Sequence, residues 1–244
     1  MKIIENTFFV LSVLFGLFLI GPEVDAPDLE KPLPEIQYCL SKLGDWIDNR
    51  EAKFDNIKPH NASKIEFYDS IPRKTPYSIL YLHGFSASTG EGDPVHYNIA
   101  RAFKANIYLP RLSNHGLVED EPLLYFTGQK YLDSAKEALA IAKKIGEKVI
   151  VISSSTGGTL SLIIGDDPQI AALLLFGPNV EIHDSRAPLL TLPWGLQIAE
   201  LVVGSKYHIM DKITEEKKNY WTTRYRLEPT IELQKLIETG MQKE

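Results

Sequence analysis

The stretch that decides the fold runs from Lys148 to Gly158 and reads KVIVISSSTGG. Its first half is continuously apolar, which favours a strand in the middle of a sheet that is covered on both faces. Its second half consists of small residues and leads into an apolar segment that predicts a short helix over 157–165. The sequence therefore predicts a sharp turn from a buried strand into a helix.

This turn is close to the pattern in which small residues stand two positions on either side of a nucleophilic serine. Ser155 is at the centre, Ser153 stands where the first glycine is usual, and Gly157 keeps the second. Small residues are needed because so tight a turn brings two stretches of backbone together. We expect the Ser155 hydroxyl to stand at a helix N-terminus, where backbone N–H groups stabilise negative charge. The alternative is a polar turn in which Ser155 or Thr156 only caps the helix.

Strands and helices alternate along the rest of the chain. Further buried strands are expected at 77–82 and 170–176, and helices at 96–104 and 128–145. Such alternation predicts an α/β fold, with a mostly parallel sheet and helices on both faces. In sheets of this kind ligands bind at the carboxyl ends of the strands, so the residues that follow each strand are candidates for function.

The strand at 77–82 is followed by HGFSAS at 83–88, a loop of small residues after a His-Gly pair. A loop in this place supplies the first N–H of an oxyanion hole, and the residue after the nucleophile supplies the second. We therefore expect the N–H groups of Phe85 and Thr156 to face the Ser155 hydroxyl. The alternatives are a plain turn, and a phosphate-binding loop for which the G-K-[ST] and G-x-G-x-x-G patterns are missing.

Three motifs together resemble the α/β-hydrolase superfamily, and within it the bacterial carboxylesterase and monoacylglycerol-lipase-like branch. They are YLHGFSAS at 81–88, LPRLSNHG at 109–116 and ISSSTGG at 152–158. The resemblance covers about residues 64–180 and departs from the family pattern at Ser153. It implies the α/β-hydrolase fold and a serine hydrolase that cleaves carboxylic esters of acyl or other apolar substrates, with Ser155 as the nucleophile.

In this family the triad continues, in chain order, with an acid and then a histidine. After the serine come only His183 and His208, and the nearest acids are Glu181, Asp184 and Asp211. His183 and Asp184 are sequence neighbours and would point apart, and no predicted strand follows His208 to hold it above the nucleophile. The resemblance therefore implies a sequence that is incomplete at its C-terminus and lacks the triad acid and histidine, so that this chain alone would be nearly inactive.

Residues 181–244 are expected to form a helical lid region that follows the strand at 170–176. The segment is rich in apolar and aromatic side chains and ends in a helix expected over 228–244. An apolar lid over the nucleophile would bind an acyl or other apolar group, whereas the alternative is ordinary helix packing.

The N-terminal region divides into two segments. Phe8 to Gly21 reads FFVLSVLFGLFLIG, a length typical of a secretory signal peptide and short for a helix that spans a bilayer. We expect residues 1–26 to be a signal peptide or N-terminal anchor, and the protein to be exported, periplasmic or secreted, or membrane-anchored. The proline-rich segment 27–35 is expected to be a linker, and the core to extend over 36–180.

The composition excludes several classes of protein. With 44% hydrophobic and 24% charged residues, the 244-residue chain is typical of a globular protein. A net charge of -6 without a long basic run argues against a nucleic-acid partner. One cysteine, Cys39, excludes an internal disulfide, and the histidines lack metal-ligand spacing, so we expect no metal or cofactor.

The partner that the sequence favours is a small apolar ester, with membrane association through residues 8–21 as a further prediction. Two competing functions stay open. One is a non-catalytic exported binding protein on the same scaffold, and the other is a structural protein tethered to a membrane by the N-terminal segment.

Overall fold

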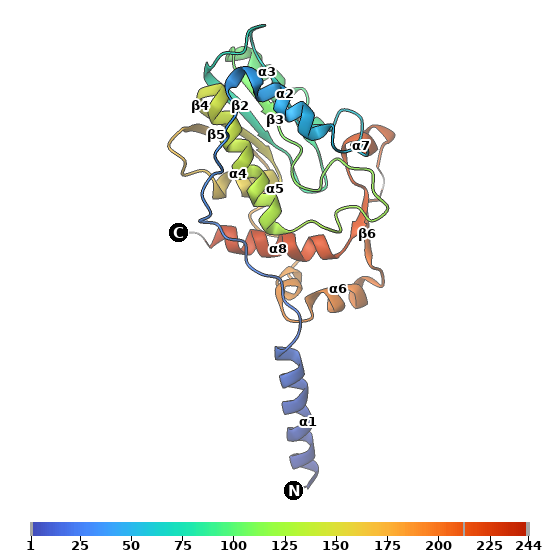
Figure 1. Cartoon of the computed structure of the whole chain (residues 1–244). Coiled ribbons are helices and arrows are strands. Elements are labelled where there is room, and N and C mark those ends of the chain that lie inside the picture. Colours follow the sequence, from blue (N-terminus) through green and yellow to red (C-terminus); the bar gives the residue numbers. More distant parts are fainter. Residues whose placement is uncertain (1, 212, 243–244) are drawn as a thin grey trace.

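The computed structural model describes residues 2–211 and 213–242, with side chains from residue 6 onward; the expected domain bounds also include positions 1, 212 and 243–244, which lie outside the described residues. Figure 1 shows a layered body from which one N-terminal helix projects. In chain order the helices are α1 (Lys2–Leu19), α2 (Leu40–Glu51), α3 (Val95–Ala102), α4 (Gly128–Ile145), α5 (Thr156–Ile163), α6 (Gly195–Val203), α7 (Glu215–Tyr220) and α8 (Glu228–Met241), with the 3-10 helices η1 (Thr89–Gly92) and η2 (Ala187–Thr191).

A five-stranded sheet in the order β1-β3-β2-β4-β5 forms the centre of the body. Strands β3, β2, β4 and β5 are parallel, and β1 runs antiparallel to β3. The predicted α/β class with a mostly parallel sheet is therefore confirmed. Its strands are β1 (Lys64–Glu66), β2 (Thr75–Leu82), β3 (Asn106–Leu109), β4 (Gly146–Ser154) and β5 (Ile170–Phe176), and a separate antiparallel hairpin is made of β6 (Tyr207–Ile209) and β7 (Arg224–Arg226).

The central strands feed two cores because successive side chains point to opposite faces of the sheet. Leu80 and Val151 join the larger core, which contains residues of α2, α4, α5 and α8. Ile79 and Ile150 join the smaller core on the other face, where Ala100 of α3 packs. Helices on both faces are therefore confirmed, and the apolar runs in β2 and β4 have the double burial that they predict.

The prediction that β5 is a buried strand is wrong. It lies at the edge of the sheet, pairing with β4 on one side and with no described strand on the other. Its side chains are partly or fully exposed, and Phe176 is 50% exposed. The apolar run IAALLLF cannot distinguish a central strand from an edge strand, because periodicity records side-chain chemistry and not the number of neighbouring strands.

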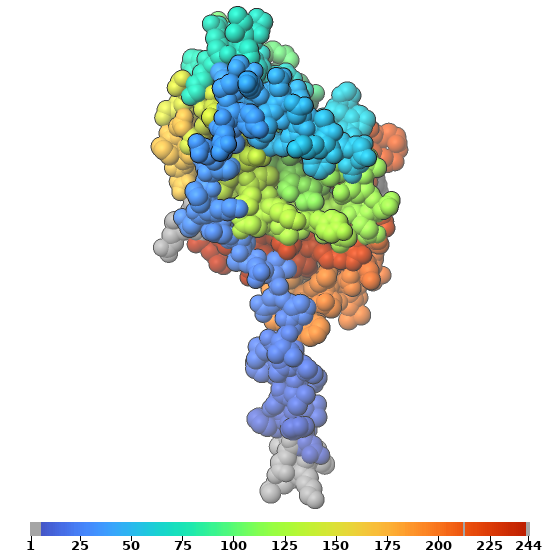
Figure 2. Space-filling view, viewed as in Figure 1, coloured from blue at the N-terminus to red at the C-terminus, as the bar shows by residue number. Residues whose placement is uncertain are grey.

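The helix α1 stands apart from the body, and the proline-rich segment after it runs back along the body (Figures 1 and 2). That segment has neither helix nor strand over 27–35, but α4 holds it. The Asp28 N–H donates to the Gln129 side chain at 2.6 Å, and the Lys136 ammonium donates to the Leu29 carbonyl at 2.7 Å.

Within the described part of the chain, no helix has both the length and the apolar character needed to cross a membrane. Export of the protein stays a prediction.

The region after β5 separates into an outer and an inner part. The outer part contains α6, which Figure 1 shows below the body on the side where α1 leaves it. The inner part is α8, which confirms the helix expected from residue 228 and ends at Met241. Leu236 and Ile237 of α8 are buried in the larger core, and Gly240 packs against Ile163 of α5. The last described helix is thus part of the core that supports the sheet.

Candidate functional site

Ser155 occupies the turn between β4 and α5 with a backbone that serine rarely adopts. Its φ of 50° and ψ of -121° lie in a region that costs a residue with a side chain roughly 1–3 kcal/mol. Three backbone hydrogen bonds hold it there. The Ser155 N–H donates to the Phe176 carbonyl at 3.1 Å, and the Ser155 carbonyl accepts from the N–H groups of Gly158 and Asn179, each at 2.9 Å. Strain held in this way points to a functional position.

Gly157 makes the turn sterically feasible. A β-carbon at this position would lie 2.1 Å from the Leu82 carbonyl oxygen and 2.8 Å from that of His83. The backbone of α5 therefore passes directly against the end of β2. This is the close backbone approach for which the sequence requires a small residue.

Ser153, the residue in place of the usual first glycine, is completely buried at the end of β4. Its hydroxyl makes no hydrogen bond with the described residues. The structure thus accommodates the β-carbon of Ser153, while its hydroxyl is buried without a hydrogen-bond partner to offset the loss of water.

Replacing Ser153 with alanine is expected to raise the free energy of unfolding by about 1 kcal/mol, because it removes a buried, unpaired hydroxyl. Urea unfolding checks this, with Ser78→Ala as the matched control. The Ser78 hydroxyl is equally buried but donates to the Ala142 carbonyl at 2.8 Å, so its removal is expected to cost about 1 kcal/mol. Equal destabilisation by both substitutions would contradict the assignment.

The loop after β2 lies beside the turn. A β-carbon on Gly84 would be 3.1 Å from that of Ser155. The Phe85 N–H donates to none of the described residues. Thr156 is the first residue of α5, so its N–H has no intrahelical acceptor. The structure thus places Thr156 directly after Ser155 and Phe85 directly after Gly84, the loop residue beside Ser155. Their role as an oxyanion hole stays a prediction.

Glu91 of η1 holds this loop, and sequence reasoning missed it. Its half-buried carboxylate accepts the Gly84 N–H at 2.8 Å and the Tyr81 hydroxyl at 3.2 Å. Burial, followed by the nearby Glu91 charge, raises the pKa of Tyr81, so the phenol stays protonated and donates. A glutamate seven residues beyond Gly84 gives no sequence signal, because its position depends on how η1 folds back.

Two buried histidines hold the same loop through hydrogen bonds. His83 Nδ1 donates to the Gly84 carbonyl at 2.9 Å, while Nε2 accepts the Leu112 N–H at 3.2 Å. His115 accepts the Ser86 N–H on Nε2 at 3.0 Å, and its Nδ1 donates to a carbonyl. The repeated His-Gly pairs at 83–84 and 115–116 are the sequence signal for this brace, although their partnership is visible only in the structure.

Burial lowers the pKa of His83 to about 4, and burial followed by the neighbouring His83 lowers the pKa of His115 well below its usual value. Both rings are therefore neutral at pH 7. An unfolded histidine has a pKa near 6.5, so the unfolded chain binds protons first as the pH falls. The contribution of these neutral histidines to the free energy of unfolding is therefore fully present above about pH 6.5 and is lost progressively as the pH falls toward 4.

We expect His83 alone to account for a loss of about 3 kcal/mol of unfolding free energy between pH 7 and pH 4. The check is the difference in urea unfolding between these pH values for the parent, His83→Gln and the exposed-site control His183→Gln. The His83→Gln substitution should remove most of this pH-dependent loss, while His183→Gln controls for the exchange of a histidine as such. An unchanged pH dependence in His83→Gln would contradict the assignment.

The two histidines after the serine are not assembled into a catalytic pair with it. His208 stacks on Tyr225 with ring centroids 5.0 Å apart, and Tyr225 in turn packs against Phe85 at 5.3 Å. His183 is exposed, and its neighbour Asp184 pairs with Arg186 at 2.6 Å, a contact that lowers the pKa of that carboxyl. Within residues 2–211 and 213–242, the Ser155 hydroxyl hydrogen-bonds to no histidine.

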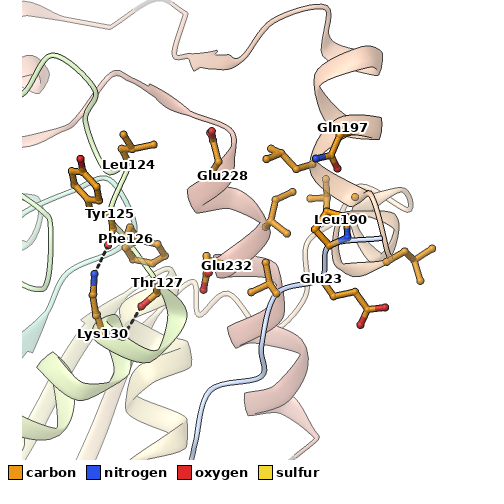
Figure 3. Close-up of a pocket in the computed structure, with 16 residues that line it drawn as sticks. Glu23, Leu124, Tyr125, Phe126, Thr127, Lys130, Leu190, Gln197, Glu228 and Glu232 are labelled. Atoms are coloured by element: carbon orange, nitrogen blue, oxygen red, sulfur yellow. Dashed lines mark hydrogen bonds between the residues drawn. The ribbon is translucent and has the colours of Figure 1, made fainter. Parts of the chain in front are cut away.

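Two apolar cavities adjoin α6. The first, of about 410 Å³, lies between the segment 22–24, the loop 124–127, α6 and α8 (Figure 3). Figure 3 shows Glu228 and Glu232 on the α8 side and Lys130 across from them. The second, of about 420 Å³, lies between α6 and the segment that follows β5. Ser155 lines neither cavity, so these apolar spaces lie beside α6 and not directly over the serine.

No protein-family model matches the sequence, and no curated protein is similar to it. Solved structures are similar in fold. The metagenome-derived lipolytic enzymes LipS and LipT are represented by a structure with a TM-score of 0.60 and 14% identity, over 75% of this chain and 71% of that chain. The chain has the α/β-hydrolase fold.

Other similar structures include a monoacylglycerol lipase from Paleococcus ferrophilus, with 11% identity over 68% of each chain and a TM-score of 0.46. Another is a lipase-esterase related protein from Clostridium acetobutylicum, with 16% identity over 69% of this chain and 68% of that one, and a TM-score of 0.41. In the α/β-hydrolase fold the nucleophile stands between a central strand and the next helix, which is where Ser155 lies. Membership of the bacterial carboxylesterase branch stays a prediction.

Proposed function

We propose that the protein is a serine hydrolase that cleaves carboxylic esters of acyl or other apolar groups. The observation that carries the proposal is Ser155, held by three hydrogen bonds in a strained backbone at the carboxyl end of a central strand. Its position in an α/β-hydrolase fold, and the lipolytic activity named for the similar structure, support the same reaction class.

In this reaction the Ser155 oxygen attacks the ester carbonyl carbon while a base takes the hydroxyl proton. The carbonyl oxygen gains negative charge and accepts hydrogen bonds from the N–H groups of Phe85 and Thr156. Collapse of the tetrahedral intermediate breaks the bond to the ester's alcohol oxygen, which takes the proton from the base and leaves as the alcohol, while the acyl group stays on Ser155. Water then hydrolyses this acyl-enzyme by the same steps.

We propose that the base and its orienting acid come from outside the described residues. Ser155 has no histidine partner among them, and the outer edge of β5 has no described neighbour. A further parallel strand on this edge would end beside Phe176, whose carbonyl accepts the Ser155 N–H. A histidine after such a strand would stand close to the serine. The chain by itself should then be nearly inactive.

The test is ester turnover by the isolated chain with p-nitrophenyl butyrate. We expect a rate close to that of the uncatalysed reaction. Clear turnover that Ser155→Ala abolishes would contradict the external base while supporting the nucleophile. Turnover that survives Ser155→Ala would contradict the role of Ser155 itself.

A non-catalytic binding protein on the same scaffold is the second candidate, and the absence of a described serine–histidine pair favours it. It predicts an apolar ligand bound beside α6 and a Ser155 that does not react with electrophiles. We also propose export of the protein with the N-terminal segment retained as an anchor. Fractionation of the source cells followed by N-terminal sequencing tests this: an intact Met1 outside the cytosol supports it, and an intact Met1 in the cytosol contradicts it.

A further inference from the structure

The outer side of α6 carries apolar side chains that no described residue covers. Leu201 is 83% exposed, Val202 is 63% exposed and Ile198 is 38% exposed. The opposite side attaches the helix to the body through Ala199, which packs with residues of α8. Exposed apolar patches on a protein surface commonly mark an interaction site. We call this patch the α6 face, and it consists of Ile198, Leu201 and Val202.

The end of α1 is fixed to the start of α6. Trp194, directly before α6, donates from its indole Nε1–H to the Leu17 carbonyl at 3.1 Å and from its backbone N–H to the Pro22 carbonyl at 3.2 Å. Gly21 lies against the indole ring, since a β-carbon there would be 2.3 Å from it. Figure 2 shows α1 leaving the body beside α6.

Both α1 and α6 are apolar helices with few charged residues. Residues 6–22, which include most of α1, carry no charge, and α6 has a single charged residue, Glu200. Most described side chains of α1 are exposed; Phe8 in its first half and Ile20 directly after its end are each about three-quarters exposed. Water is an unfavourable environment for both surfaces, and one apolar phase would cover both.

We propose that the α6 face and α1 dock together on a zwitterionic lipid–water interface. Trp194 lies where the apolar helices meet the polar body, and tryptophan favours this depth in a lipid surface. The protein carries a net charge of -6, so apolar insertion and not attraction to anionic lipid drives the contact. The docking goes beyond the proposed hydrolase activity and does not depend on Ser155.

The cavity of about 420 Å³ lies directly behind this face. Ile198, Val202 and Val203 line it from α6, and Ile182 and Leu227 line it from the body. An acyl chain that leaves a lipid surface under α6 therefore meets apolar side chains without crossing water. A second copy of the chain would instead cover the face and close the cavity.

A fluorescence experiment tests the docking at the residue level. Cys39 is the one cysteine of the sequence, so a Cys39→Ser background accepts a polarity-sensitive label at a single new position. Leu201→Cys reports on the α6 face, and Ile71→Cys is the control, at a 73% exposed residue in the turn before β2. With phosphatidylcholine vesicles that contain spin-labelled lipid, we expect a blue shift and quenching at position 201 and neither at position 71.

Vesicle co-sedimentation of the full chain measures how much the α6 face contributes to lipid binding. Leu201→Glu should lower the vesicle partition coefficient by about tenfold, because it puts a charge in place of an exposed apolar side chain that docking would bury in the lipid. Ile71→Glu should leave it within about twofold, and raised salt should change neither result. Because both residues are strongly exposed, both variants should keep the parent circular dichroism spectrum.

Three results would overturn the proposal. No spectral change at position 201 means that the face does not contact lipid. Equal partition of Leu201→Glu and the parent means that α1 docks alone. A concentration-dependent dimer that Leu201→Glu dissociates, without vesicle binding by the parent, means that a second copy covers the face. None of these readouts uses catalysis, so they are independent of whether the hydrolase proposal holds.

Discussion

Replacing Ser155 with alanine in the protein isolated from its source is expected to reduce ester hydrolysis by at least about a thousandfold. The nucleophile forms the covalent bond, so no neighbouring hydroxyl can take its place. The remaining rate would come from direct attack of water on the ester carbonyl, with the N–H groups of Phe85 and Thr156 stabilising the oxyanion. Initial rates with a p-nitrophenyl ester measure the loss.

The matched control for this substitution is Ser154→Ala. Ser154 is the last residue of β4, next to the nucleophile but within the regular strand. Its removal should change the rate by no more than about threefold, because it does not enter the strained turn. If both variants retained the parent rate, Ser155 would not be the nucleophile.

Replacing Gly157 with alanine is expected to lower the free energy of unfolding by about 4 kcal/mol. The new β-carbon would overlap the Leu82 carbonyl oxygen. The β-carbon is attached rigidly to the backbone of α5, and the carbonyl belongs to the backbone of β2. Neither can move away as a flexible side chain would. Urea unfolding of the purified chain at pH 7 measures the change.

Gly44→Ala is the control for the Gly157 substitution. Gly44 lies within α2, and a β-carbon there meets nothing within 4 Å. Alanine should stabilise the chain by about 0.5–1 kcal/mol, because it lowers the entropy of the unfolded state and favours the helix. A Gly157→Ala variant as stable as the parent would show that α5 does not pass against β2 as described.

The sequence KVIVISSSTGG was sufficient to predict the central strand, the turn and the helix, because apolar period and small-residue spacing are local properties. The loop at 83–88 was predictable for the same reason. The edge position of β5 was not, since strand order depends on contacts between distant segments. The sequence left open whether α8 packs in the core or forms part of a lid, because an amphipathic helix has the same pattern in both places.

The hydrogen bonds that hold the loop 83–88 were the least predictable part of the candidate site. Glu91, His83 and His115 hold the loop 83–88 through hydrogen bonds that link residues up to 29 positions apart in the chain. No sequence pattern indicates the partners of Glu91, whereas the His-Gly pair at 83–84 predicts that His83 braces the loop, which its hydrogen bonds confirm. The expectation that no strand follows His208 is wrong, because His208 lies in β6 and pairs with Tyr225 of β7. The absence of a triad acid and histidine from this chain stays a prediction.

The most direct test of the central claim is fluorophosphonate labelling of the protein isolated from its source, followed by peptide mapping. These reagents modify a serine that a base and an oxyanion hole activate. The account predicts a single tag, on the peptide that contains Ser155, and no tag in Ser155→Ala. A tag on another residue, or an unmodified Ser155 in the folded protein, would contradict it.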